Sequence, residues 1–221
     1  ATAALMKKMI GSVFPPEYIL YAEGEGGTLI PGMMRTFSFD HVFFTGSTVI
    51  GKEIYKMAAE KLTPVTLELG GKSPAVVEAD ANIKVAARRI AMTKFSNAGQ
   101  MCVAPDYVLV HISQKEKLIQ EFKNTLQQFF GNDAAASDNF GRIINENQFD
   151  RLTEYLKEGN IIQGGETDRN GLYIAPTLMD GVNVDSRIMQ EEIFGPILPI
   201  LVFDTKEQAL AIIEANKNPL A

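Results

Sequence analysis

The sequence contains few of the residues that build several common kinds of site. Its 221 residues include one cysteine, two histidines and no tryptophan. One cysteine cannot form an internal disulfide, so nothing indicates an oxidised, secreted scaffold, and we expect a reducing, cytoplasmic location. So few cysteine and histidine side chains also exclude a Cys-rich or His-rich zinc site, and we expect no bound metal.

A basic excess and a long apolar run are missing too. The formal net charge at pH 7 is -6, from 21 Lys and Arg against 27 Asp and Glu, and the basic residues form no stripe. This balance excludes a general nucleic-acid binder, which needs clustered positive charge. No apolar run approaches the roughly 20 residues of a membrane-spanning helix. The first residue is Ala1 and not Met, which indicates a chain that is processed or cut from a longer product.

What the sequence does contain is an alternation of helical and extended patterns. The expected helices are Leu5–Val13, Ile50–Leu62, Asn82–Phe95, Lys115–Phe130, Gln148–Lys157 and Lys206–Ala215. The expected strands are Tyr18–Ala22, His41–Phe44, Pro64–Leu69, Ala75–Glu78, Tyr107–Ile112, Asn160–Gln163, Leu172–Leu178 and Ile197–Phe203. Strands separated by helices of this length indicate βαβ units with largely parallel sheets, and therefore an α/β fold.

Two glycines and a proline interrupt the alternation at Gly70, Gly71 and Pro74, and we expect a domain boundary there. Residues 1–70 then hold only three candidate strands, half the number in a complete doubly wound dinucleotide-binding domain. Residues 71–221 form the second expected domain.

Cys102 is the first candidate for chemistry. Without context, a single cysteine is more often a small buried apolar residue than a nucleophile. Here it follows Asn97, Gly99 and Gln100 after a predicted helix, so we expect the thiol on a connection, with Gly99 allowing another molecule to approach the backbone. A nucleophilic thiolate needs donors for the oxyanion that forms when it attacks a carbonyl. The residues alone leave both the structural and the catalytic interpretation open.

Glu68 is the second candidate, because it lies between Leu67 and Leu69 at the end of a strand that is expected to be buried. Charged residues are rarely buried without a partner or a purpose. Glu68 could lie at an exposed strand end or form a structural ion pair. Its functional interpretation is a general base that activates water.

Gly46 and Ser47 lie between a predicted strand and a predicted helix, where free backbone N–H groups can receive phosphate oxygens. The segment is not the dinucleotide-binding glycine fingerprint, and Ser47 could be no more than an N-cap. His41 and His111 lie at strand ends and are expected to be structural, which excludes a Cys–His protease pair.

Four segments taken together resemble the aldehyde dehydrogenase superfamily. They are Phe44–Ser47 (FTGS), Leu67–Lys72 (LELGGK), Asn97–Cys102 (NAGQMC) and Glu191–Pro196 (EEIFGP), in the order and approximate spacing of the family. The resemblance extends through all 221 residues. The stretch Cys102–Tyr107 (CVAPDY) is most similar to the class 3 branch.

The resemblance implies an NAD(P)-dependent oxidation of an aldehyde to a carboxylic acid. Cys102 would be the nucleophile, forming a thiohemiacetal and then a thioester, and its own backbone N–H would supply part of the oxyanion hole. Glu68 would activate the water that hydrolyses the thioester.

The resemblance also implies residues that hold the cofactor, which is NAD or NADP. Gly46 and Ser47 would meet the pyrophosphate, and Leu69 would lie near the nicotinamide carboxamide. Glu192 would hold the nicotinamide ribose, and Phe194 would pack against that end of the cofactor.

By the same resemblance, residues 1–70 are the C-terminal portion of a Rossmann-like NAD(P)-binding domain. Residues 71–221 are then an α/β catalytic domain that is incomplete at its C-terminus. The residues that meet the adenosine ribose, and an Asn that completes the oxyanion hole, would precede this chain.

Class 3 enzymes tend to oxidise medium-to-long aliphatic and aromatic aldehydes, and we expect the full-length protein to be a homo-oligomer. Two other interpretations remain open. One is a catalytically incomplete fragment that acts only as a folded binding or assembly module, and the other is a thioesterase-like activity of Cys102 alone.

Overall fold

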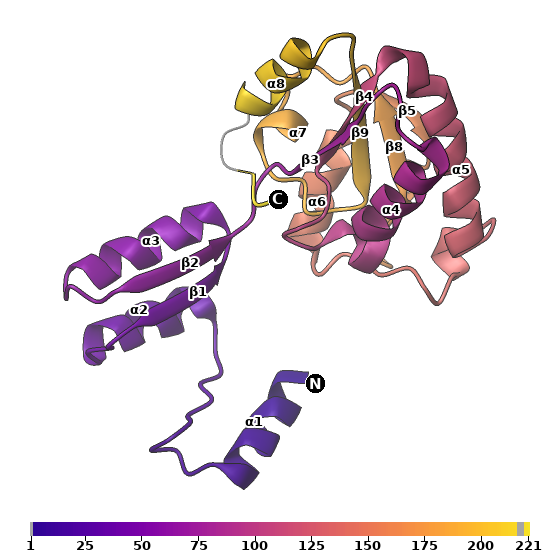
Figure 1. The fold of residues 1–221 in the computed structure, drawn as a ribbon. Helices are drawn as coiled ribbons and strands as arrows, with labels where there is room; N and C mark the ends of the chain where they lie inside the picture. The colour runs from indigo at the N-terminus through magenta and orange to yellow at the C-terminus, as the bar shows by residue number, and fades with distance from the viewer. Residues whose placement is uncertain (1, 216–218) are drawn as a thin grey trace. The chain divides into compact units, whose positions relative to one another are not determined.

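The computed structural model describes residues 2–215 and 219–221. The chain divides into two compact units, Ala1–Leu69 and Gly70–Ala221, and each is described by itself (Figure 1). The division adjoins the glycine pair at which the sequence predicts a boundary. The functions assigned to the two parts remain predictions.

The first unit is built around one parallel βαβ motif. Strand β1 (Val42–Gly46) leads into helix α3 (Thr48–Ala59), and β2 (Val65–Leu69) returns beside β1 in parallel register. Helix α3 buries Gly51, Ile54 and Ala58. Helices α1 (Thr2–Val13) and α2 (Gly26–Thr36) precede the motif. The motif confirms the predicted α/β class for this unit.

Three expectations for the first unit are wrong. Tyr18–Ala22 is not a strand; Tyr18 is 82% and Leu20 70% exposed, because no neighbouring strand pairs with this segment within the described residues. The sheet therefore has two strands instead of three. The strand at His41–Phe44 was expected to be buried, but β1 alternates and Phe43 is 66% exposed, since a two-stranded sheet cannot cover both of its faces.

The second unit contains a five-stranded sheet in the order β3-β4-β9-β8-β5. Its strands are β3 (Pro74–Val77), β4 (Tyr107–His111), β5 (Asn160–Gln163), β8 (Thr177–Asp180) and β9 (Ile197–Phe203). All neighbouring pairs are parallel except β5 with β8. The central strands β4 and β9 are almost wholly buried, as their continuous apolar runs predict.

Helices of the second unit surround this sheet (Figure 1). They are α4 (Ile83–Phe95), α5 (Lys115–Phe130), α6 (Glu146–Tyr155), α7 (Arg187–Gln190) and α8 (Lys206–Ala215). The helix starts follow ordinary capping chemistry: Asn82 Oδ1 accepts from the Val85 N–H at 3.2 Å, and Asn145 Oδ1 accepts from the Gln148 N–H at 2.9 Å. The predicted helices 82–95 and 115–130 are confirmed.

One strand predicted in the second unit is wrong. The run Leu172–Leu178 is divided into β7 (Tyr173–Ile174) and β8, and β7 pairs with β6 (Thr167–Asp168) outside the main sheet. Pro176 lies at the break, and proline has no N–H to donate to a ladder.

Candidate active site

Cys102 lies on an exposed turn between α4 and β4. The chain leaves α4 through the segment Ser96–Gly99, in which Asn97, Ala98 and Gly99 have left-handed backbone with φ of 49°, 52° and 73°. A hydrogen bond from the Ala104 N–H to the Met101 carbonyl, at 3.1 Å, closes the turn. The prediction that the thiol lies on a connection is correct.

The backbone N–H of Cys102 donates no hydrogen bond within the described part of the chain. A free N–H beside an exposed thiol is the arrangement that an oxyanion donor requires. The thiol and a donor for the oxygen of an attacked carbonyl therefore belong to the same residue.

Gln100 fixes this turn to a distant segment. Its Nε2 donates to the Arg142 carbonyl at 2.9 Å and to the Asn97 carbonyl at 3.0 Å, and its Oε1 accepts from the Ile144 N–H at 3.0 Å. One amide side chain thus satisfies three backbone groups, two of them more than 40 residues away in sequence. The turn is held in place two residues before the thiol.

The space above Gly99 is occupied by the chain itself. A Cβ at this position would overlap the backbone carbonyl group of Gly195, and the φ of 73° already disfavours any residue with a side chain. The expectation that Gly99 leaves room for another molecule is therefore wrong. The glycine instead lets two backbone segments of one chain touch.

The segment that contacts Gly99 also carries Glu192 and Phe194. Glu192 is half-buried, and its carboxylate accepts the N–H of Gly71. Burial raises the pKa of Glu192, the nearby negative charge of Asp106 raises it further, and the hydrogen bond from Gly71 opposes both effects. Phe194 has a φ of 50° and is 38% exposed, so it is not a core residue.

Three charged residues are buried behind this segment: Lys72, Lys94 and Asp106. Lys72 and Asp106 form an ion pair, and burial lowers the pKa of Lys72 although Asp106 opposes the shift. Lys94 is fully buried, and its ammonium group has no hydrogen-bond partner in the described structure. Burial lowers the pKa of Lys94 to about 8.

Sequence reasoning missed these three residues, yet a signal for Lys94 was present. On α4, Lys94 lies four residues after Ile90 and three after Ala91, both of which are buried. A lysine in register with an apolar helical face must be buried or must reach past its neighbours to water.

The remaining predicted residues lie in the first unit, at the carboxyl ends of its two strands. Thr45 pairs with Glu68 and Gly46 with Leu69. Ser47 follows Gly46 and caps α3, with its Oγ accepting from the Ile50 N–H at 3.4 Å. Thus Gly46, Ser47, Glu68 and Leu69 lie together.

Glu68 differs from its predicted surroundings. It was expected at a buried strand end, but its side chain is exposed, since β2 has only β1 and α3 to cover it. Within residues 2–215 and 219–221 it forms no ion pair. An exposed carboxylate at a strand end has access to water.

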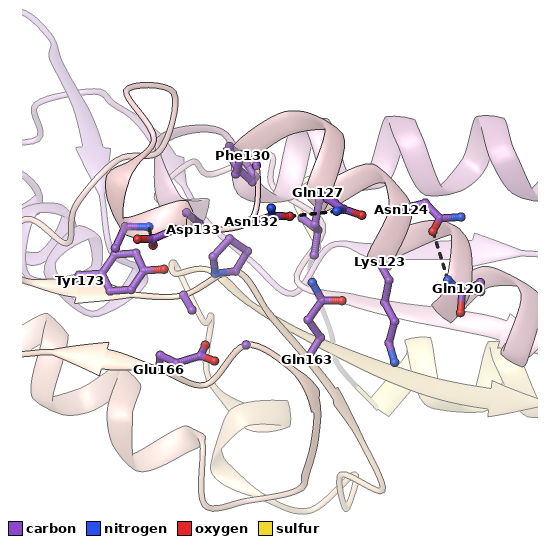
Figure 2. Close-up of a pocket in the computed structure, with 17 residues that line it drawn as sticks. Gln120, Lys123, Asn124, Gln127, Phe130, Asn132, Asp133, Gln163, Glu166 and Tyr173 are labelled. Atoms are coloured by element: carbon purple, nitrogen blue, oxygen red, sulfur yellow. Dashed lines mark hydrogen bonds between the residues drawn. The ribbon is translucent and has the colours of Figure 1, made fainter.

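A groove of about 600 Å³ lies beside α5 in the second unit (Figure 2). Five amide side chains line it, and two pairs of them bond to each other: Gln120 to Asn124 at 3.1 Å and Gln127 to Asn132 at 3.0 Å. None of the predicted site residues lines it. The groove therefore contributes no nucleophile or base to the candidate site.

Two further properties concern metals and membranes. In the described ranges, no group of three or more His, Cys, Asp and Glu side chains could hold a metal ion. Among the same residues, no helix combines the length and the apolar character needed to cross a bilayer.

Comparison with known proteins decides the family. The model of the aldehyde dehydrogenase family matches residues 1–221. The chain belongs to the aldehyde dehydrogenase family. Its fold agrees, because a solved structure of Staphylococcus aureus AldH in a substrate-bound state superposes with a TM-score of 0.94 at 48% identity, over 99% of this chain and 48% of that one.

The chain is also similar to two curated relatives. The 4,4'-diaponeurosporen-aldehyde dehydrogenase of Staphylococcus aureus is 49% identical over 99% of this chain and 48% of its own length. The dimeric NADP-preferring aldehyde dehydrogenase of Rattus norvegicus is 44% identical over 93% of this chain and 46% of its own. The chain spans about half the length of the curated relatives it matches.

Proposed function

We propose that the full-length protein containing this chain is an NAD(P)-dependent aldehyde dehydrogenase and that these 221 residues are its central part. The overall reaction converts an aldehyde, water and NAD(P)⁺ into a carboxylic acid, NAD(P)H and a proton. The observation that carries the proposal is the exposed Cys102 turn with its free backbone N–H, in a chain that the family model matches throughout.

Cys102 is the nucleophile in this proposal. Its thiolate attacks the aldehyde carbon, the C=O double bond opens, and the oxygen is stabilised by the backbone N–H of Cys102. When the carbonyl forms again to give a thioester, the hydrogen of that carbon leaves as hydride. NAD(P)⁺, when bound, supplies the acceptor for this hydride.

The residues present fit one end of such a cofactor. The start of α3, next to Gly46 and Ser47, presents backbone N–H groups and the positive end of a helix dipole, which suit a pyrophosphate. The half-buried carboxylate of Glu192 suits ribose hydroxyls, and the exposed ring of Phe194 suits a flat apolar group. Leu69 is assigned to the nicotinamide carboxamide.

Glu68 is the general base of the second half-reaction. Its exposed carboxylate takes a proton from water, the resulting hydroxide attacks the thioester carbon, and the Cys102 thiolate leaves as the acid is released. An exposed carboxylate at the end of β2 can exchange its proton with solvent between turnovers.

The names of the two relatives support the finer assignments. One acts on a diaponeurosporen aldehyde and the other is dimeric and prefers NADP. We therefore assign medium-to-long aliphatic or aromatic aldehydes as substrates, a homo-oligomeric full-length protein in the cytoplasm, and NAD or NADP as cofactor.

The test is aldehyde-dependent NAD(P)H formation by the full-length protein and its Cys102→Ser variant. We expect turnover to fall by at least about 10³-fold, since the hydroxyl is a far weaker nucleophile than the thiolate. Unfolding midpoints of the two proteins should agree, because the exchanged side chain is exposed. Undiminished turnover in the variant would show that Cys102 is not the nucleophile.

The competing hypothesis is that the 221-residue chain alone is a folded binding or assembly module without catalysis. Calorimetry of NAD with this chain separates the two interpretations, because the chain spans about half the length of its curated relatives. Tight binding to the isolated chain would contradict the expectation that it holds only part of the cofactor site. Steady hydrolysis of a thioester by the isolated chain, lost in Cys102→Ser, would instead support the thioesterase-like alternative.

A further inference from the structure

Side chains from elsewhere in the second unit form hydrogen bonds to four backbone groups of Glu191–Ile193. Lys72 Nζ donates to the Glu191 carbonyl at 2.9 Å, and Asp106 Oδ1 accepts from the Ile193 N–H at 3.0 Å. Arg151 donates to the Glu192 carbonyl at 3.1 Å and to the Ile193 carbonyl at 2.7 Å. Side chains from outside the segment therefore fix the peptide groups on both sides of Glu192.

Lys72 and Asp106 make these contacts as a buried ion pair. Their side chains are 7% and 3% exposed, and the ammonium also donates to the Ile188 carbonyl at 2.7 Å. An ammonium has three N–H groups, and here all three have acceptors: Asp106, Ile188 and Glu191. The pair thus connects the segment before β3 with the segment after the Cys102 turn and with residues 188–193.

The two glycines before Lys72 complete the arrangement around Glu192. A Cβ at Gly70 would overlap both carboxylate oxygens of Glu192, and the N–H of Gly71 donates to that carboxylate. Three consecutive residues, Gly70–Lys72, therefore contact the segment that carries Glu192. Gly70 leaves space for the side chain of Glu192, Gly71 bonds to it, and Lys72 holds the backbone beside it.

We infer that the Lys72–Asp106 ion pair is a positioning device that orients Glu192 toward the nicotinamide ribose. The inference rests on the proposed function, which assigns the ribose to Glu192. A buried ion pair seldom stabilises a fold more than packed apolar residues of the same volume. Here the ion pair orients the backbone, because no apolar pair could form hydrogen bonds to the carbonyl on one side of Glu192 and to the N–H on the other.

The experiment compares variants of the full-length protein in two rapid measurements. One is the burst of NAD(P)H formed in the first turnover, which depends on the orientation of the cofactor. The other is acylation of Cys102 by an activated phenyl ester without cofactor, which depends on the thiol alone. The variants are Asp106→Asn, Glu192→Gln, their combination, and Asp180→Asn as the matched control. Asp180 forms a partly exposed ion pair with Lys115 at 2.6 Å, and among the described residues none of its side-chain hydrogen bonds reaches residues 188–193.

We expect Asp106→Asn and Glu192→Gln each to slow the burst by about tenfold or more, since small displacements of a positioning group have effects of this size. The combined variant should be no slower than the slower single one, because both changes act through the carboxylate of Glu192. Acylation should stay within about twofold of the parent in every variant, and Asp180→Asn should leave both rates unchanged.

A further variant, Lys72→Met with Asp106→Leu, guards against misfolding, because it replaces the pair with apolar side chains and leaves no unpaired buried charge. It should keep the unfolding midpoint of the parent and still lose the fast burst. A normal burst in this variant or in Asp106→Asn, with a slow burst in Glu192→Gln, would overturn the inference. A normal burst in Glu192→Gln would instead reject the role that the proposed function gives to Glu192.

Discussion

Gly99 and Gly195 touch backbone to backbone. A side chain at residue 99 would overlap the Gly195 carbonyl group, so the contact requires glycine at that position. Gly99 precedes the turn that carries Cys102, and Gly195 follows directly after Phe194. Main-chain packing therefore connects the turn of Cys102, the proposed nucleophile, with the proposed cofactor segment. At the far end of the same turn, Asp106 bonds to the Ile193 N–H.

The Glu68→Gln variant should separate the two half-reactions. A glutamine cannot accept a proton from water, so the thioester should form normally and then persist. We expect a full burst of NAD(P)H and a steady rate reduced by about 10²-fold or more. Stopped-flow absorbance measures both quantities. Glu60→Gln, another exposed carboxylate of the same unit, is the control, and equal loss of burst and steady rate in Glu68→Gln would place Glu68 in an earlier step.

The Gln100→Ala variant should loosen the Cys102 turn. It removes three hydrogen bonds to backbone groups and should lower the free energy of unfolding by about 1–3 kcal/mol. Because the thiol then samples more orientations, its acylation by an activated ester should slow by about tenfold. Gln120→Ala, which loses one exposed hydrogen bond to Asn124, should change neither quantity. An unchanged acylation rate in Gln100→Ala would show that the turn keeps its shape without the amide.

The Gly70→Ala variant should displace the carboxylate of Glu192 without unfolding the protein. Its added methyl group overlaps the end of a flexible side chain, which can rotate away, although the bond from Gly71 is then lost. We expect the NAD(P)H burst to slow by about tenfold while ester acylation is retained. Gly32→Ala, where an added Cβ meets nothing within 4 Å, is the control. Parallel loss of both activities in Gly70→Ala would mean that the backbone has moved.

The Lys94→Met variant should alter the dependence of stability on pH. The pKa of Lys94 is lowered from 10.5 to about 8 by burial, so between these values the unfolded chain holds the proton that the folded protein has lost. The free energy of unfolding of the parent should therefore rise by up to about 3 kcal/mol across that window. Below pH 8 both the folded and the unfolded chain hold the proton, so this rise is absent there.

Denaturant unfolding at pH 7 and pH 10, performed on the parent, Lys94→Met and Lys84→Met, measures this effect. Lys84 lies on the same helix but is exposed, so its variant should follow the parent. Lys94→Met should show a smaller rise than the parent, since only the contribution of Lys94 is removed and that of Lys72 stays. It should be at least as stable as the parent at pH 7, because it buries no unpartnered ammonium. A rise of equal size in Lys94→Met would mean that Lys94 is not the group responsible.

Local patterns predicted the elements that tertiary contacts do not alter. Pro15 and Pro16 limit α1 to Thr2–Val13, and the apolar runs Tyr107–Ile112 and Ile197–Phe203 predict the strands β4 and β9. The failures occur where a partner strand decides the outcome. Tyr18–Ala22 has a strand-like composition but no strand beside it in the described structure. An apolar run can be a strand only if another strand accepts its hydrogen bonds.

The sequence predicted only part of the candidate site, because the rest also depends on distant partners. The four motifs identify Cys102 and Glu192, because their neighbours in sequence are distinctive. The sequence does not reveal the burial of Lys72 and Asp106, which lie 34 residues apart and meet a third segment more than 80 residues from either. Long-range hydrogen bonds of this kind depend on the strand order, which local spacing does not determine.

The exposed thiol of Cys102 has a practical consequence, because this chain has no second cysteine to compete with it. A fluorophore coupled through maleimide would report from the turn alone, and its emission would follow the approach of an aldehyde. A mercury compound would bind at one place in the chain and provide a heavy-atom derivative for crystallographic phasing. Oxidants would act on the same sulfur atom. The mass of the protein after treatment with a thiol reagent would therefore give the fraction of molecules whose Cys102 can still react.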